Sequence, residues 1–413
     1  MAEDRLRRGQ HDVRGAEDFP SIGPSAGMPA GPLIGWLLCA MSWLTAFAAG
    51  LLAPVLPQMV RQFAQVPHVQ ARVSLVATAP ALAVALVALL VGYLSDRVGH
   101  RRILLAGLLV YSIAGTAPVF MQSLDTIIAS RFVMGIGEAT TMSMSSALIA
   151  LYFDGAERAR WLSVQVASSN VVGLLILLSG GLIGRLSWRA PFLVYALPLI
   201  LLLLAMRHLH QPEHRHSPRE GGERWSTANI RAVAASCLLL MFATASIGAL
   251  IVDFPFLFDS RGIADPAMVG LMVGVCAFGL TLGTALGGIA TRLPRRPVQV
   301  GAFLLIACGF GLAAMTTSPW MAACWGAAAG LGIGVLIPPL LNHTMANAPP
   351  RSVGLVGGLW TTAVFVGQFA GPIGIELARQ QLHSIDAAIR CAGIAAAALA
   401  GILLVSAARR GAV

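Results

Sequence analysis

Apolar residues in this chain run in long stretches that are separated by short polar turns. No charged residue occurs from 33 to 60 or from 73 to 95. Each stretch reaches the roughly 20 residues that a helix needs to cross about 30 Å of hydrocarbon. Lipid offers the backbone no hydrogen-bond partner, so such stretches form helices there. The pattern therefore predicts an all-α integral membrane protein.

Charges, Pro/Gly breaks and polar turns divide the chain into twelve predicted transmembrane helices. Their approximate limits are 33–57, 73–95, 102–122, 126–151, 159–184, 188–206, 231–257, 267–290, 298–317, 320–344, 353–378 and 385–407. The longest polar interruption, Arg207 to Thr227, divides them six and six. The predicted domains are a flexible cytoplasmic tail over 1–31, a six-helix bundle over 32–206, a cytoplasmic linker over 207–229, a second six-helix bundle over 230–408, and a cytoplasmic tail over 409–413.

Composition and charge agree with a membrane protein and predict its orientation. The chain is 57% hydrophobic and 11% charged, whereas soluble domains carry about 25% charged residues. All 28 basic residues are arginines, and most fall on the cytoplasmic side if the N-terminus lies there. The positive-inside rule then places both termini in the cytoplasm and the chain in the inner (cytoplasmic) membrane. The net charge of +10 follows from topology, so no nucleic-acid partner is expected.

Two short stretches occupy matching places in the two halves. "GYLSDRVGHRR" runs from Gly92 to Arg102, and "GGIATRLPRR" runs from Gly287 to Arg296. Each follows the second span of its own half, and an ungapped alignment places Arg97 on Arg292. A repeated element of this kind is typical of secondary transporters.

The first stretch resembles the loop 2–3 signature of the major facilitator superfamily. "SRFVMGIGEA", Ser130 to Ala139, resembles the span-four motif of that family, and "SWRAPFLVYA", Ser187 to Ala196, resembles the start of its span six. The resemblance covers nearly the whole chain. It implies the major facilitator fold, with two pseudo-symmetric six-helix bundles, and transport by alternating access.

The first stretch also has a physical interpretation. Gly92 allows a neighbouring helix to approach closely, and Asp96 can meet the N-terminus of span eleven near Ser352 to Gly358. The resemblance implies that such a contact latches the two halves in the outward-facing state. The residues expected in this latch motif are Gly92, Asp96, Arg97, Gly99 and Arg101. The alternative is a solvated loop that only determines topology.

Ionisable residues inside spans are costly and are functional candidates. Arg131 and Glu138 are seven residues apart in span four, so they lie two turns apart on the same side of the helix. Asp253 lies near the outer end of span seven. Proton coupling or a cavity charge is expected for these three residues, because a desolvated carboxyl favours its proton-bearing form. The alternatives are that Arg131 snorkels to the outer interface and that Asp253 is an interfacial acid.

The uncharged candidates for lining a substrate cavity are Met134, Asn170, Trp360 and Gln368. Polar and small residues in membrane helices also serve helix packing, and that alternative stays open. Glu376 and Arg379 are expected to form an exposed i,i+3 pair. No metal-ligand spacing, phosphate-binding loop or nucleophile–base set is present in the sequence, so no metal, no cofactor and no enzymatic activity are expected.

These observations favour a secondary active transporter that exports a small organic molecule in exchange for protons. A drug, or a secreted metabolite such as a siderophore, is the expected substrate class. "GLLILLSGGLIG", Gly173 to Gly184, lacks the Gly-Pro pair that exporters of the family often carry. The alternative is an uptake symporter for a small organic anion, with Arg131 as the counter-charge. The expected partners are the substrate, protons and the lipid bilayer, and the protein is expected to be a monomer.

Overall fold

The computed structural model describes residues 31–211, 226–349 and 352–411, and all regular structure in these ranges is helical. Nearly all of the predicted N-terminal tail and much of the predicted linker lie outside the described residues. The all-helical prediction is confirmed. The chain passes twelve times through one bundle, as the hydrophobic pattern predicts.

The first half contains six passages, of which the first is broken. That passage comprises α1 (Pro32–Ser42), α2 (Leu44–Gly50), the 3-10 turn η1 (Ala53–Val55) and α3 (Leu56–Gln62). The other elements are α4 (Val69–Val98), α5 (His100–Thr116), η2 (Ala117–Val119), α6 (Leu124–Tyr152), α7 (Gly155–Gly184), α8 (Ala190–Leu193), η3 (Val194–Ala196) and α9 (Pro198–His208). Pro54 and Pro57 have no N–H to donate, so the single helix predicted over 33–57 cannot continue there.

The second half repeats this arrangement. Its elements are α10 (Thr227–Val252), α11 (Phe254–Ser260), α12 (Pro266–Ala290), α13 (Arg295–Met315), α14 (Pro319–Ala346), α15 (Val353–Leu382) and α16 (Ile385–Gly411). The seventh passage breaks at Asp253, just before Pro255. It therefore consists of α10 and α11 rather than one helix.

Ten passages within the described residues are long and apolar enough to cross a membrane. The remaining two, α6 and α15, are 29 and 30 residues long. Besides Asp125 at the start of α6, these two helices carry Arg131, Glu138, Glu376 and Arg379. Arg131, Glu138 and Glu376 are buried, so α6 and α15 bring charge into the bundle.

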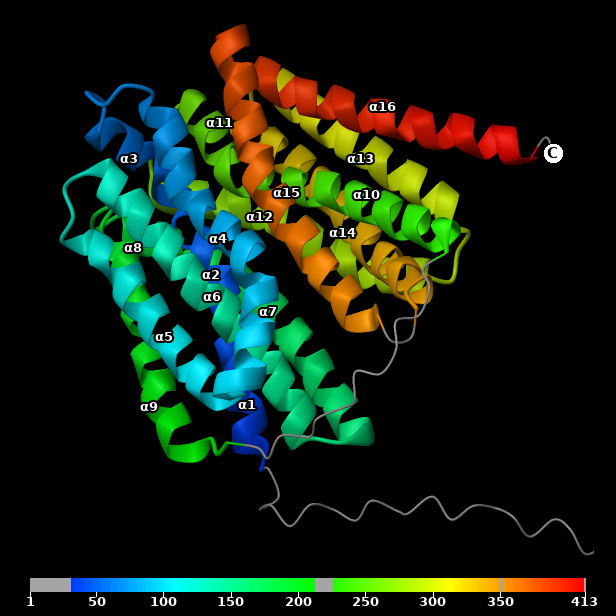
Figure 1. Ribbon diagram of the computed structural model, residues 1–413. Helices are drawn as coiled ribbons and strands as arrows, with labels where there is room; N and C mark the ends of the chain where they lie inside the picture. Colours follow the sequence, from blue (N-terminus) through cyan, green and yellow to red (C-terminus); the bar gives the residue numbers. More distant parts are fainter. Residues whose placement is uncertain (1–30, 212–225, 350–351, 412–413) are drawn as a thin grey trace, which may run out of the picture.

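Two hydrophobic cores form, one almost entirely from α1–α9 and the other mainly from α10–α16. Figure 1 shows the two groups of helices, α1 to α9 from blue to green and α10 to α16 from green to red. The short helix α11 contacts both cores. Phe256 belongs to the first core, whereas Phe254 and Phe258 belong to the second.

The bundle has two ends, which we name by their arginine content. The basic face is formed by residues 92–102, 152–158, 207–211, 226–231, 290–296, 346–349 and 352. The opposite face is formed by residues 61–72, 117–123, 185–190, 259–266, 316–319 and 382–386. The two halves contact each other through α7 against α12 and α4 against α15.

At the opposite face the two halves are in close contact. A Cβ atom on Gly181 of α7 would lie 2.5 Å from the carbonyl oxygen of Pro266, at the start of α12. Arg61 pairs with Asp259 across the boundary at 2.6 Å. Arg185 donates from Nε to Oδ1 of Asp265 at 2.8 Å. This face is therefore closed.

Towards the basic face the same four helices carry exposed apolar side chains. These include Leu86 and Leu90 on α4, Val166 and Val171 on α7, Phe278 and Leu282 on α12, and Leu355 and Leu359 on α15. A Cβ atom on Gly92 would have no neighbour within 4 Å. The basic ends of the two halves, marked by α9 and by the C-terminal end of α16, point in clearly different directions (Figure 1). The halves thus diverge at the basic face.

Candidate proton and substrate site

Arg131 lies in the middle of the first core and is fully buried. Its Nε donates to the carbonyl oxygen of Val76 at 3.1 Å, and Nη2 donates to that of Ala48. Nη1 contacts the sulfur of Met134 at 2.8 Å, and the guanidinium carbon lies 4.9 Å from the ring centre of Tyr195. The side chain does not snorkel to an interface, so that alternative is wrong for this structure.

The two carbonyl groups that accept from Arg131 are free because the helices that carry them are interrupted. Pro80 lies inside α4 and has no N–H to donate to Val76, four residues earlier. Ala48 lies in the last turn of α2, where carbonyl groups have no intrahelical partner. The helix breaks and the arginine therefore satisfy each other's hydrogen-bonding needs.

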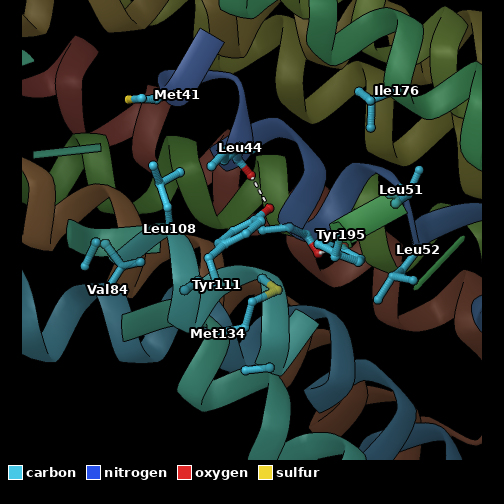
Figure 2. Packing of buried hydrophobic residues seen from close by; sticks show 14 of the residues in the cluster. Met41, Leu44, Leu51, Leu52, Val84, Leu108, Tyr111, Met134, Ile176 and Tyr195 are labelled. Carbon is cyan, nitrogen blue, oxygen red and sulfur yellow. Dashed lines mark hydrogen bonds between the residues drawn. The ribbon is translucent and has the colours of Figure 1, made fainter. Parts of the chain in front are cut away.

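Two tyrosines hold the broken first passage in place beside Arg131. The hydroxyl of Tyr111 donates to the carbonyl of Leu44 at 2.7 Å, as the dashed line in Figure 2 shows. The hydroxyl of Tyr195 donates to the carbonyl of Phe47 at 2.7 Å. The two ring centres lie 5.8 Å apart. Tyr195 belongs to the "SWRAPFLVYA" stretch, but the sequence did not indicate that it would reach Arg131.

Glu138 lies two turns further along α6 and is 2% exposed. Its Oε2 atom has no hydrogen-bond partner among the described residues. Helices α4 and α5 approach closely here: a Cβ on Gly135 would lie 2.5 Å from the carbonyl of Pro80, and one on Gly137 would lie 2.6 Å from the backbone nitrogen of Tyr111. A carboxylate in such a dry position is costly. This arrangement favours a carboxyl that carries a proton.

The described latch-motif residues contact their own half. Arg97 stacks over Tyr93 at 4.5 Å, and Nη2 of Arg101 donates to the carbonyl of Met206 at 2.9 Å. Gly99 forms the turn between α4 and α5 with a φ of 101°, a conformation that favours glycine. The side chain of Asp96 lies outside the described part of the structure. The predicted contact with the start of α15 therefore stays a prediction.

The predicted cavity residues occupy different environments. Met134 is fully buried and contacts Arg131, so it presents no surface to a ligand in this conformation. Asn170 on α7 and Trp360 and Gln368 on α15 are half-buried. These two helices lie at the boundary between the halves. Asn170 is next to a polar cluster in which Ser168 accepts from Trp43 and Ser169 bonds to Ser42, each at 3.0 Å.

Asp253 lies at the break between α10 and α11 and is 3% exposed, and its Oδ2 atom has no partner among the described residues. Glu376 pairs with Arg379, as predicted. The predicted exposure of this pair is wrong, because Glu376 is only 6% exposed. Its side chain lies inside the second half at the opposite face, on the part of α15 that packs against the end of α10: a Cβ on Gly248 would lie 2.8 Å from Cδ of Pro372.

The described residues include the six cysteines and a glycine-rich stretch of α14. No group of three or more His, Cys, Asp or Glu side chains there could hold a metal ion. All six cysteines are free thiols. The glycines of "GAAAGLGIG" (Gly326 to Gly334) pack against neighbouring helices: a Cβ on Gly330 would lie 2.5 Å from the carbonyl of Cys276.

The fold and the buried charges define a multi-pass membrane transporter, and comparison with known proteins gives its family. The Major Facilitator Superfamily model matches residues 38–372. The chain belongs to this superfamily. It is 30% identical to the class C tetracycline resistance protein of Escherichia coli, over 68% of this chain and 73% of that protein.

Other relatives have different names. The chain is 27% identical to a probable 4-methylmuconolactone transporter of Cupriavidus pinatubonensis, over 53% of each protein. A crystal structure of a bacterial homologue of the human lysosomal transporter Spinster, inward-facing and occupied, superposes with a TM-score of 0.72 at 18% identity. That superposition covers 93% of this chain and 96% of the homologue. It confirms the fold.

Proposed function

We propose that this protein exports a small organic molecule across the inner membrane in exchange for protons. The observation that carries the proposal is Glu138, a buried carboxyl with an unpartnered oxygen, two helical turns from the fixed charge of Arg131. The similarity to tetracycline resistance proteins supports export of a drug-like molecule. The basic face is assigned to the cytoplasm, which makes the opposite face extracellular.

In this mechanism Arg131 is a fixed charge and Glu138 is the group whose protonation changes. The hydrogen bonds of Arg131 to Val76 and Ala48 keep the guanidinium in place. Glu138 then holds a proton while the halves enclose it and releases that proton when water reaches it from the basic face. Substrate enters from the same side, between α7 and α15, past Asn170, Trp360 and Gln368. The Asp96 latch motif closes the basic face in the next step.

The alternative is uptake of a small organic anion together with protons. The similarity to a 4-methylmuconolactone transporter supports it. Arg131 has no exposed surface in this conformation. An anionic substrate would therefore reach its counter-charge only after α6 has moved relative to α2 and α4.

Everted membrane vesicles with an acid interior test the direction and the coupling together. Exchange with protons predicts that tetracycline, or another small molecule from a substrate panel, accumulates inside these vesicles. Symport predicts that the acid interior instead drives substrate out. If transport does not respond to the gradient, proton coupling is wrong.

The residue assignment needs a matched pair of variants. Glu138→Gln keeps the shape of the side chain and removes its charge. This variant should abolish gradient-driven transport. Substrate binding, measured by tryptophan fluorescence, should remain. Glu157→Gln, an exposed acid at the basic face, should retain wild-type transport. Full activity of Glu138→Gln would show that another group carries the proton.

A further inference from the structure

Besides Glu138, two more buried acids lie at the opposite face, and both are far from Glu138 along the chain. Asp253 occupies the break between α10 and α11, and Glu376 projects from α15. Both side chains are more than nine-tenths buried. Neighbouring residues on either side, Val252 and Phe256, pack into the core of the first half. The acids therefore lie next to the surface on which the halves close.

The charges in this pair do not balance. Arg379 donates from Nε and Nη2 to the two carboxylate oxygens of Glu376, at 2.8 and 2.7 Å. The amide of Gln380 donates to the same carboxylate at 3.0 Å. Asp253 receives none of these hydrogen bonds, and its Oδ2 atom has no partner. One cation thus serves two acids, and a single negative charge is left over.

The other charged residues described at this face have different contacts and do not supply the missing cation. Four ion pairs form there: Arg61 with Asp259, Arg72 with Asp125, Arg185 with Asp265, and Arg261 with Asp386. Arg189 stacks over Trp188 and donates to the carbonyl of Met121. Outside these pairs, His68, His383 and Arg390 are exposed. A buried charge without a partner costs several kcal/mol or is neutralised. The closed face therefore requires one added positive charge at Asp253 and Glu376.

We propose that Asp253, Glu376 and Arg379 form a proton-binding site within the extracellular gate, and that the gate closes only when this site carries a proton. The proton comes from external water: an O–H bond forms at a carboxylate oxygen as one in hydronium breaks. The proposal rests on the proposed proton coupling and adds to it the place where protons enter.

The connection to the gate runs through α11. This helix of seven residues starts directly after Asp253 and ends beyond Asp259, which pairs with Arg61 of the first half. Its Phe256 packs in the first core and its Phe258 in the second. A change in charge at Asp253 therefore acts at the start of a short helix that packs in both halves at this face.

The site gives the exchange cycle its order. When the opposite face opens, water reaches the two acids. Hydration then stabilises the ionised form of the site. The ionised site opposes closure, since closing would bury the uncompensated charge. Only a carrier that has taken up an external proton returns to the conformation seen here, and this prevents an empty return without a proton.

Distance measurements across the gate test this proposal without substrate or gradient. Spin labels are attached through Phe120→Cys and Leu382→Cys, which are exposed at the opposite face on different halves, in a background without the native cysteines. Samples in lipid nanodiscs are compared between about pH 5 and about pH 9. The wild-type distance should be short in acid and should lengthen as the pH rises.

The variants should remove this dependence on pH. Asp253→Asn carries no charge, so the gate should stay closed at every pH. Glu376→Gln releases Arg379 to neutralise Asp253, so it should also stay closed, and it keeps the test available if Asp253→Asn does not fold. Asp125→Asn, an exposed acid at the same face, should retain the wild-type pH response.

Three outcomes would overturn the proposal. The first is a wild-type gate that does not respond to pH, and the second is a wild-type response in both Asp253→Asn and Glu376→Gln. The third is a shorter distance between the spin labels at about pH 9 when sodium replaces choline in the buffer, because the added positive charge would then be a metal ion and not a proton. The vesicle assay tests the proposed function separately, because it needs substrate and a proton gradient. The distance measurements need neither, so the two proposals can fail independently.

Discussion

Arg131 occupies the hydrogen-bonding position that Pro80 leaves open on the backbone of α4. The proline withholds an N–H from the carbonyl of Val76, and the guanidinium supplies the replacement. The same side chain reaches the last turn of α2. A buried cation without an acidic partner is thereby held by peptide dipoles, which leaves Glu138 free of any ion pair with it. The site combines a fixed positive charge with a carboxyl whose protonation can change.

Arg131→Lys should lower the stability of the folded protein. A lysine ammonium is a point charge and cannot serve two carbonyl groups and a tyrosine ring at once. Each buried carbonyl left without a partner costs about 1–3 kcal/mol. Thermal unfolding in detergent, followed by tryptophan fluorescence, should show a lower midpoint. Arg158→Lys, at an exposed position of the basic face, should match the wild type.

Gly137→Ala should be destabilising because the added methyl group meets backbone atoms. It would lie 2.6 Å from the nitrogen of Tyr111 and 2.7 Å from the carbonyl oxygen of Gly107. Overpacking of this kind costs about 1–3 kcal/mol. Gly301→Ala is the matched control, because nothing lies within 4 Å of its Cβ position, and it should gain about 0.5–1 kcal/mol. Equal melting temperatures for the two variants would contradict the close approach of α5 and α6.

Gly181→Leu should prevent closure of the opposite face. Its Cβ atom would lie 2.5 Å from the carbonyl oxygen of Pro266, on the other half. A cysteine introduced by Phe256→Cys is nearly inaccessible in the closed gate and should become reactive towards a membrane-impermeant maleimide. Gly401→Leu, whose Cβ position is open, should leave the labelling rate unchanged. Unchanged labelling in Gly181→Leu would show that the gate closes elsewhere.

The ion pair between Arg185 and Asp265 should not produce the pH response of the gate. Hydrogen bonding to Arg185 lowers the pKa of Asp265. A lowered pKa means that the pair contributes above the ordinary aspartate value of about 3.9 and is lost only as the pH falls through the lower folded value. Between about pH 5 and about pH 9 its contribution is therefore constant.

Asp265→Asn tests this directly. The asparagine can still cap α12, where the Asp265 side chain accepts from the backbone nitrogen of Ala267, but it loses the charge. The distance between the halves should lengthen, and the midpoint of the pH response should move to lower pH, because a less stable closed gate needs a higher proton concentration to close. High salt should have a similar effect on the wild type, because the pair is exposed and screened. Loss of the pH response in Asp265→Asn would assign that response to this pair.

The hydrophobic pattern was sufficient to predict the twelve passages and the all-helical fold. Bilayer thickness and backbone hydrogen bonding dictate both, and neither depends on tertiary contacts. The seven-residue spacing of Arg131 and Glu138 likewise placed both on one side of α6, because helical periodicity is a local property. The break in the first passage was missed, although Pro54 and Pro57 were visible in the sequence.

The site formed by Asp253, Glu376 and Arg379 could not be predicted from local patterns. Asp253 lies directly after α10 and Glu376 lies on α15, and the short helix α11 and the three long helices α12, α13 and α14 separate them in the chain. The i,i+3 spacing indicated the pair of Glu376 with Arg379, but burial depends on which helix packs over it. For the same reason Met134 was expected in a cavity, whereas it packs beside Arg131.

The dual packing of α11 limits how this protein can be divided. Phe256 belongs by sequence to the second half and by contact to the first. Chains covering residues 1–211 and 226–413, produced separately, would each leave part of a core uncovered. The repeat that suggests an ancestral duplication has thus become asymmetric: the present halves depend on each other to complete their interiors, and an isolated half is expected to be recovered only when the other is co-expressed.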